Sequence, residues 1–337
     1  MDFPTAFDPS TCVRKGLCPV TKIRGEGPEL LESHSLYYEQ HGRGTDYKVV
    51  FIMGLNSSSF SWAPQVQHFG HSTEHSILVF DNRGVGNSGY PRGPYTTAGM
   101  AQDAITLLDF IGWTAKRELH IVGISLGGMI AQELASRIPD RIASMVLAVT
   151  TPGGRIWNNF PPWNGICALT RLLFTPDVTK KVPTVMNMLF PASWLDSKAE
   201  DDPAGRTNRQ VQTEAYLRRV AITTPQQFVG HISQMAAGLT HHCALDRLKF
   251  ISHSIPKIVI LTGDEDNLVL PQHSFELKDA MPEAELIRWA ETGHGIHVQR
   301  AKEFNRLLER TFREGRERSL LSQSTTTLES QTGVFII

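Results

Sequence analysis

The sequence has little of what marks several large classes of protein. It holds four cysteines among 337 residues, and its formal net charge is -1. So few thiols in so long a chain do not form the dense disulfide framework of small secreted domains. A near-neutral charge without a long basic block argues against a nucleic-acid partner. No uncharged apolar run approaches the roughly 18 residues of a membrane span.

The N-terminus also lacks a targeting segment. Residues 1–9 contain two aspartates and no basic region followed by an apolar run, which a secretory or transit peptide would need. The apolar fraction of 41% and the charged fraction of 20% are ordinary for a globular chain, so a sizeable core can form. We therefore expect a soluble, cytoplasmic protein.

What the sequence does contain is an alternation of short apolar runs with helical patterns. The runs are residues 49–52, 77–80, 119–122, 145–148 and 258–261. Near-continuous Val, Ile and Leu is typical of strands buried on both faces, which predicts a mostly parallel sheet flanked by helices. A more polar strand is expected at 35–41, near one edge, and the last strand at 286–289.

Helical patterns fill the gaps between these runs. Residues 97–110 predict a helix with Asp103 on its polar face, and residues 126–138 predict another that stops at Pro139. Apolar residues at helical spacing between 299 and 315 predict a closing amphipathic helix.

Residues 155–254 interrupt the alternation, because they show no clear strand and are rich in large apolar side chains. They predict a helical cap inserted between two strands. The expected organisation is an N-terminal extension (1–34), an α/β core (35–154 and 255–315), the cap (155–254) and a Ser/Thr-rich, disordered tail (316–337).

Gly123, Ser125 and Gly127 form a Gly-x-Ser-x-Gly motif between a predicted strand and a predicted helix. A serine on such a sharp turn needs glycines two residues away on either side, so that neighbouring backbone can approach closely. The serine then lies at a helix N-terminus, where negative charge is favoured. The motif predicts a nucleophile at Ser125; the plain alternative is a glycine-rich turn with an incidental serine.

A serine nucleophile requires a histidine base and a carboxylate that orients it. The strand expected at 256–261 runs into Asp264, Glu265 and Asp266, at the end of the strand where open α/β sheets place their sites. The last strand runs into a glycine-flanked His294. Acid and base thus follow the serine in the order that the motif requires.

At this point the chain resembles the α/β-hydrolase fold family, from about Ser35 to Phe312. The resemblance implies that the acid lies three residues after the glycine that ends its strand, which is Asp266. The family's other acid position corresponds to residues 150–154, which hold no carboxylate. The family's Gly-His motif matches His294, whereas His297 lies one helical turn further on and is expected to be structural.

The resemblance also implies two backbone N–H donors for an oxyanion. One is that of Leu126, directly after the serine. The other is that of Leu55, in the loop after strand 49–52. Met53 stands where the family often has histidine, so the side-chain bracing of this loop departs from the family pattern.

Two other patterns compete with this interpretation. Residues 84–89 match a dinucleotide-binding fingerprint, but Pro91 and Pro94 prevent the helix that must follow it. The segment instead resembles the family's Asp-x-Arg-Gly-x-Gly-x-Ser turn, in which Asp81 and Arg83 are expected to be structural. We therefore expect no nucleotide cofactor.

Histidine groups suggest a metal at first sight. They are His68, His71 and His75, and His241 with His242. Neither group has a His-Glu-x-x-His pattern or a convincing further ligand, so we expect no metal.

Together these features predict a serine hydrolase that acts on an ester, thioester or lactone of an apolar small molecule. Serine-dependent relatives also include peptidases and carbon-carbon bond hydrolases, and the motif does not separate them. A third possibility is a receptor-like binding protein on the same fold, with little turnover. Relatives that use an aspartate nucleophile, such as epoxide hydrolases and dehalogenases, are disfavoured by Ser125.

Overall fold

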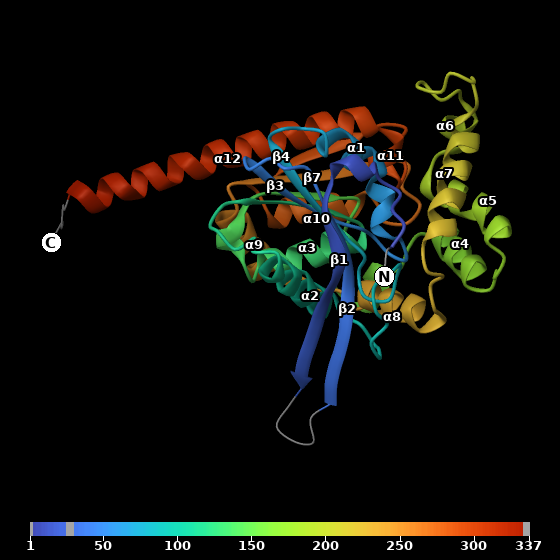
Figure 1. Ribbon diagram of the computed structural model, residues 1–337, viewed down its shortest axis with the longest axis horizontal. Coiled ribbons are helices and arrows are strands. Elements are labelled where there is room, and N and C mark those ends of the chain that lie inside the picture. The colour runs from blue at the N-terminus through green and yellow to red at the C-terminus, as the bar shows by residue number, and fades with distance from the viewer. Residues whose placement is uncertain (1–2, 25–29, 333–337) are drawn as a thin grey trace.

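The computed structural model describes residues 3–24 and 30–332, and within them eight strands form one sheet (Figure 1). The strand order is β1-β2-β4-β3-β5-β6-β7-β8. The strands are β1 (Cys12–Arg24), β2 (Leu30–His41), β3 (Tyr47–Ile52), β4 (His75–Phe80), β5 (Leu119–Ile124), β6 (Ile142–Ala148), β7 (Lys257–Gly263) and β8 (Glu285–Trp289). The pairs β1·β2 and β2·β4 are antiparallel and the others are parallel. The predicted mostly parallel sheet is confirmed.

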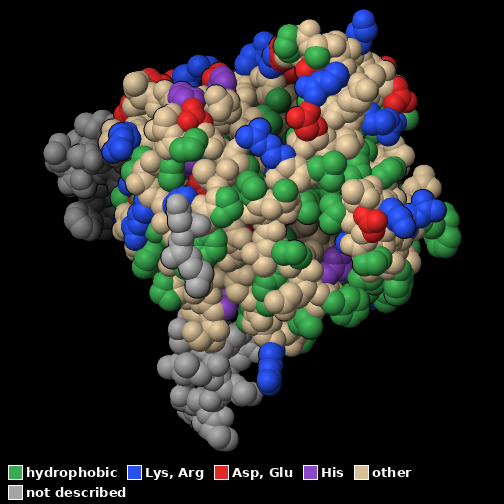
Figure 2. All heavy atoms as spheres, turned by 45° about the vertical axis from the view of Figure 1, so that its right-hand side comes forward, with side chains coloured by type: hydrophobic (Ala, Val, Ile, Leu, Met, Phe, Trp, Pro, Cys, Tyr) green, Lys and Arg blue, Asp and Glu red, His purple; other side chains and the backbone are tan. Residues whose placement is uncertain are grey.

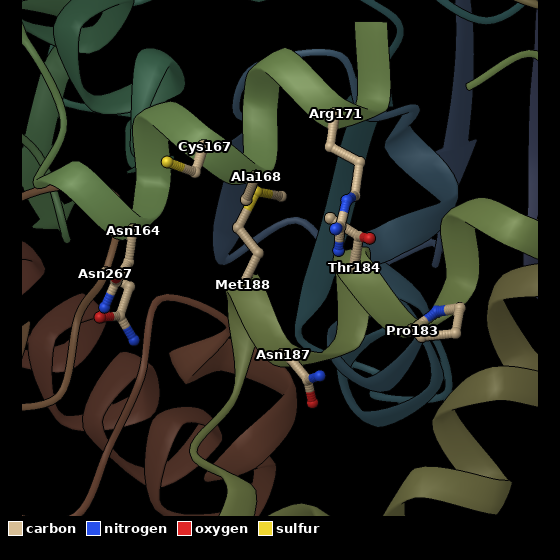
Figure 3. Close-up of a pocket in the computed structure, with 9 residues that line it drawn as sticks. All are labelled: Asn164, Cys167, Ala168, Arg171, Pro183, Thr184, Asn187, Met188 and Asn267. Atoms are coloured by element: carbon tan, nitrogen blue, oxygen red, sulfur yellow. The ribbon is translucent and has the colours of Figure 1, made fainter. Parts of the chain in front are cut away.

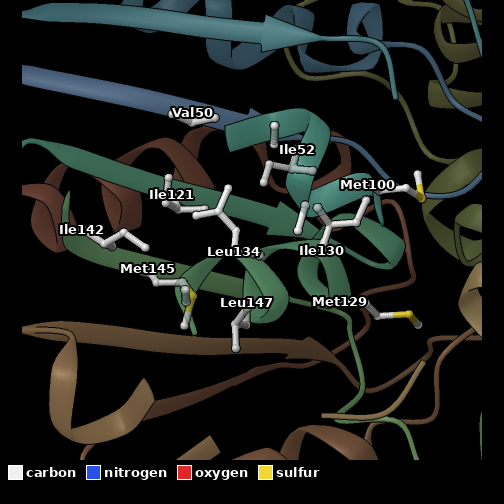
Figure 4. Packing of buried hydrophobic residues seen from close by; sticks show 14 of the residues in the cluster. Val50, Ile52, Met100, Ile121, Met129, Ile130, Leu134, Ile142, Met145 and Leu147 are labelled. Atoms are coloured by element: carbon white, nitrogen blue, oxygen red, sulfur yellow. The ribbon is translucent and has the colours of Figure 1, made fainter. Parts of the chain in front are cut away.

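Helices cover both faces of this sheet, because successive residues of each buried strand point to opposite sides. One face packs against α2 (Thr97–Phe110), α3 (Leu126–Ala135), α9 (Leu245–Ser254) and α10 (Gln272–Ala280). The other packs against α1 (Ala63–Phe69), α11 (Ile296–Gln299) and α12 (Ala301–Thr332). Figure 4 shows Val50, Ile52 and Ile121 of the sheet beside Ile130 and Leu134 of α3.

Five further helices lie between β6 and β7, to one side of the sheet (Figure 1). They are α4 (Trp163–Leu173), α5 (Val178–Leu189), α6 (Ala192–Asp196), α7 (Asn208–Ile222) and α8 (Phe228–Leu239). Short 3-10 turns complete the chain: η1 (Pro9–Thr11), η2 (Ser59–Trp62), η3 (Pro139–Arg141) and η4 (Ile156–Asn159). We call residues 155–239 the cap. It has a small apolar cluster of its own around Val185, Met186 and Phe190.

The structure differs from the expected boundary of the cap. Residues up to 254 were assigned to it, but Leu248 and Ile251 of α9 belong to the main core cluster, and Arg247 donates hydrogen bonds to Glu133 of α3. A short amphipathic helix can bury its apolar stripe against either body, and its pattern does not say which.

Both ends of the chain are also more regular than expected. Part of the N-terminal extension forms the edge strand β1 and the start of β2. At the other end α12 continues to Thr332, where a disordered tail was expected from residue 316; residues 333–337 lie outside the described residues. Its packing on the core reaches as far as Ser319: Gly315 lies against β6, and Ser319 is buried, whereas Leu320 and Leu321 are exposed. Beyond them α12 runs away from the body of the molecule (Figure 1).

None of the helices described for this chain is both long and apolar enough to cross a membrane.

Candidate active site

Ser125 occupies the turn between β5 and α3 with a strained backbone, φ 55° and ψ -123°. The flanking glycines allow this turn. A Cβ on Gly123 would lie 2.4 Å from the carbonyl oxygen of Gly127, and one on Gly127 would lie 2.0 Å from that of Ile52. Any side chain at these two positions would therefore push apart the strand, the helix and the neighbouring strand β3.

Asp266 and His294 are in direct contact. His294 Nδ1 lies 2.8 Å from Asp266 Oδ2 and 3.0 Å from Oδ1, and both residues are buried. The backbone N–H groups of Leu268 and Val269 donate to Asp266 Oδ1 at 2.7 and 2.9 Å. These bonds fix the carboxylate, which in turn orients the imidazole so that Nε2 is the nitrogen free for proton transfer.

The neighbouring candidates occupy different surroundings. Asp264 faces Arg288 at 3.4 Å and makes no contact with a histidine within the described chain. His297 packs against the ring of Trp62, with centroids 4.8 Å apart, and burial lowers its pKa to about 3. It therefore sits in the core as a neutral ring.

The loop after β3 runs alongside the serine. A Cβ on Gly54 would lie 3.1 Å from Ser125 Cβ and 3.6 Å from Ser125 Oγ. Leu55 follows in this loop and Leu126 begins α3, and within residues 3–24 and 30–332 neither N–H group donates a backbone hydrogen bond. Two free donors thus lie on the segments that border the hydroxyl.

No hydrogen bond joins Ser125 Oγ to His294 in the described structure. Bonds of this kind are often long without substrate and tighten in the complex.

The loop is braced from outside, by residues that the sequence did not single out. Asn82 Nδ2 donates to the carbonyl of Met53 at 2.9 Å. The N–H of Asn56 donates to Gln234 Oε1 of α8 at 2.8 Å, and Gln234 Nε2 donates to the carbonyl of Arg83. These polar side chains supply the bracing that was in doubt because Met53 replaces histidine. The pairing of Asn56 with Gln234 joins positions 178 apart, which no local pattern could reveal.

The cap also contacts the histidine loop. The N–H of Gly295 donates to the carbonyl of Leu189 at 2.8 Å, and a Cβ on Gly295 would lie 2.3 Å from the ring of Phe190. The glycine after His294 thus admits the end of α5 to this loop.

The turn after β4 is a structural unit. Asp81 Oδ1 accepts hydrogen bonds from the N–H and hydroxyl of Ser59, and its other oxygen accepts from the N–H of Asn87. Burial raises the pKa of Asp81 to about 6. Arg83 forms a two-pronged ion pair with Asp103, both bonds 2.6 Å long. Asp103, expected on the polar face of its helix, is buried in the structure, and Arg83 compensates its charge there.

The family model of the α/β-hydrolase fold matches residues 47–301. The chain belongs to this family. A relative from Caulobacter vibrioides, "Putative carbamate hydrolase RutD", is 30% identical over 281 residues, which are 81% of this chain and 93% of the relative.

Solved structures agree with the fold. A thermophilic esterase from Thermogutta terrifontis superposes with a TM-score of 0.66 at 19% identity, over 88% of this chain and 99% of the esterase. The enol-lactonase from Burkholderia xenovorans LB400 superposes with a TM-score of 0.65 at 22% identity, over 82% and 96%. These likenesses show that the chain has the α/β-hydrolase fold.

A cavity of about 470 Å³ lies between α4 and α5 of this hydrolase (Figure 3). Cys167, Arg171 and Met188 are among the residues that line it. Its wall includes Asn267, the residue after Asp266, but not Ser125, Asp266 or His294. The cavity therefore borders the candidate site rather than containing it.

Part of the cap surface is strongly apolar. The side chains of Trp157, Trp163 and Phe174 are 65%, 75% and 76% exposed. Figure 2 turns the cap side toward the viewer and shows hydrophobic side chains across that face. Other cap aromatics pack internally: the rings of Phe190 and Trp194 have centroids 4.9 Å apart.

The histidine groups noted in the sequence are dispersed. His68 pairs with Glu309, His75 contacts Ser72 and His241 contacts Thr97. Among the described residues, neither group gathers three potential metal ligands.

Proposed function

We propose that this α/β-hydrolase cleaves an ester, thioester or lactone of a small apolar molecule through an acyl-enzyme on Ser125. His294 is the general base and Asp266 the carboxylate that orients it. The single observation that carries the proposal is the buried His294–Asp266 pair, 2.8 Å apart, in a chain whose only Gly-x-Ser-x-Gly turn holds Ser125 in a strained conformation.

The reaction follows from these positions. The Ser125 hydroxyl attacks the substrate carbonyl carbon as His294 Nε2 takes its proton. The oxygen that becomes negative accepts hydrogen bonds from the N–H groups of Leu55 and Leu126, which have no backbone partner in the described chain. The imidazolium then protonates the leaving group, and a water molecule activated by His294 hydrolyses the acyl-enzyme.

A carbamate is a second candidate substrate, because the 30% identical relative bears the name of a carbamate hydrolase. Its carbonyl carbon is attacked by the same atoms, so the site chemistry is shared. Peptide and carbon-carbon bond cleavage and receptor-like binding remain alternatives that use the same fold.

The test has two parts. A labelled fluorophosphonate should attach covalently to the wild type and fail to attach to Ser125→Ala. The variant should lose about 10⁴-fold or more of kcat on an activated ester, as in other serine triads. Ser136→Ala, at the other end of α3, is the matched control.

A panel of esters of graded acyl length, lactones, thioesters, carbamates and aminopeptides then ranks the substrates. Turnover that survives in Ser125→Ala would refute the acyl-enzyme. Labelling of the wild type without turnover of any substrate would favour the receptor-like alternative.

A further inference from the structure

Three potential metal ligands converge at the start of β1, where the sequence showed no motif. In the antiparallel register Cys12 lies opposite His41, and Glu39 precedes His41 by two residues on the same face of β2. The Cys12 sulfur, a Glu39 carboxylate oxygen and a His41 ring nitrogen all lie within 4.8 Å of one another. Glu39 and His41 have no exposed surface, and Cys12 is partly buried.

The hydrogen bonds around His41 are compatible with two neutral tautomers. The Thr11 hydroxyl lies 2.9 Å from the carbonyl of Asp8 and 2.8 Å from His41 Nδ1. When the hydroxyl donates to Nδ1, Nε2 carries the hydrogen; when it donates to the carbonyl, it accepts from Nδ1–H, and Nε2 is a bare acceptor.

That bare nitrogen faces another acceptor. His41 Nε2 lies 3.2 Å from Glu39 Oε2, which already accepts from the hydroxyl of Thr5 at 2.9 Å. The other carboxylate oxygen accepts from the Tyr37 hydroxyl at 2.6 Å. Two buried lone pairs at this distance repel unless a positive charge lies between them. A hydrogen on Nε2 or a metal ion between the two atoms removes this repulsion.

Cys12 separates these two possibilities. A proton shared by His41 and Glu39 gives the nearby sulfur nothing to bind, whereas a divalent cation would bind all three side chains. With such a cation bound, thiolate and carboxylate together balance two positive charges in a buried site.

We propose that Cys12, Glu39 and His41 bind a divalent transition-metal ion, and that Zn²⁺ fits them best. Cys, His and carboxylate are ligands that zinc commonly combines, with a water completing a tetrahedron. A Nδ1–H held by Thr11 is the outer hydrogen bond that metal-binding histidines typically make. The ion would tie η1 and the segment before it to the sheet edge, where the Phe7 ring already packs on His41 at 4.9 Å.

Binding is tested on the full chain with Co²⁺ as a spectroscopic substitute for Zn²⁺. We expect one ion per chain with a thiolate-to-metal absorption band, and a higher Tm with stoichiometric Zn²⁺. Cys12→Ser should lose the band and weaken binding by at least about tenfold. The exposed Cys167→Ser, in the cap, is the matched control and should keep both.

A second measurement uses the wild type alone, so it does not depend on the folding of a variant. Zn²⁺ should protect Cys12 from alkylation in peptide mapping and leave Cys167 reactive. Equal alkylation of Cys12 with and without Zn²⁺, or an unchanged cobalt band in Cys12→Ser, would overturn the proposal. Neither readout involves the Ser125 site.

Discussion

The sheet and the cap are stabilised in different ways. Strands β4, β5, β6 and β7 are buried at every residue, between helices on both faces. The cap depends on one small cluster and leaves large aromatics such as Trp163 in solvent. The candidate nucleophile, base and acid all belong to the sheet side, each directly beyond a strand end. In the proposed mechanism the core therefore supplies the chemistry and the cap adjusts it.

The adjustment is confined to a few contacts. The cap reaches the site through Gln234, which braces the oxyanion loop, and through Leu189 and Phe190, which contact the histidine loop. Movement of the cap would therefore change the positions of the two loops to which the proposed mechanism assigns proton transfer and charge stabilisation. A closing cap would also exclude water and strengthen those electrostatic contacts.

The largest effect should come from the core. Asp266→Asn should lower kcat by about 10⁴-fold, because the amide no longer holds the imidazole in the correct tautomer. Asp264→Asn, which affects long contacts to Arg288 and to the N–H of Thr292, both at 3.4 Å, should cost less than about tenfold. Steady-state kinetics on an activated ester, with circular dichroism as a fold check, compares them. Equal losses would mean that the acid is not at position 266.

Acid should also destabilise the core. Burial lowers the pKa of His297 and of His120 from 6.5 to about 3, so the unfolded chain binds more protons between these values. The contribution of these histidines to the free energy of unfolding is therefore fully present above about pH 6.5. It falls as the pH drops, by about 2 kcal/mol per histidine between about pH 7 and about pH 5.

Urea unfolding across this range measures the slope. His297→Gln should flatten it, whatever its effect on stability itself, whereas His253→Gln, at an exposed position, should not. An unchanged slope in His297→Gln would show that this ring is protonated in the folded protein.

The link between cap and core should show a smaller effect. Gln234→Leu removes the acceptor for the Asn56 N–H. We expect kcat to fall by roughly tenfold and KM to change less, because the loop that carries Leu55 loses about one hydrogen bond that holds it in place. Gln210→Ala breaks the capping box of α7 and destabilises the cap without touching that loop. If both variants lose kcat equally, Gln234 affects catalysis only by stabilising the cap and not by holding the loop at Asn56.

The smallest effect should come from the exposed cap surface. Trp163→Ser and Phe174→Ser should change the free energy of unfolding by less than about 0.5 kcal/mol, because these side chains are already in solvent. Phe190→Ala, in the buried cap cluster, should cost about 3 kcal/mol or more. A large loss at Trp163 in thermal unfolding would show that the exposed aromatics support the cap after all.

Much of the core could be predicted because its signals are local. The five apolar runs became β3 to β7, and residues 97–110 form α2 as expected. The ends of helices, and the part of the protein on which each helix packs, were harder to predict. We assigned α9 to the cap and the end of α12 to a disordered tail, because an amphipathic pattern does not indicate which surface will bury its apolar side. The burial of Asp103 could not be predicted for the same reason, because its partner Arg83 lies outside α2.

The sequence alone determined the fold family, the Gly-x-Ser-x-Gly turn and the order of serine, acid and histidine, since each depends on spacing within a short segment. Only the tertiary structure decided that Gln234 braces Asn56 and that Cys12 meets Glu39 and His41. These contacts join residues far apart in the chain, and their partners are chosen by packing and by the need to satisfy buried polar groups. A one-dimensional pattern carries neither constraint.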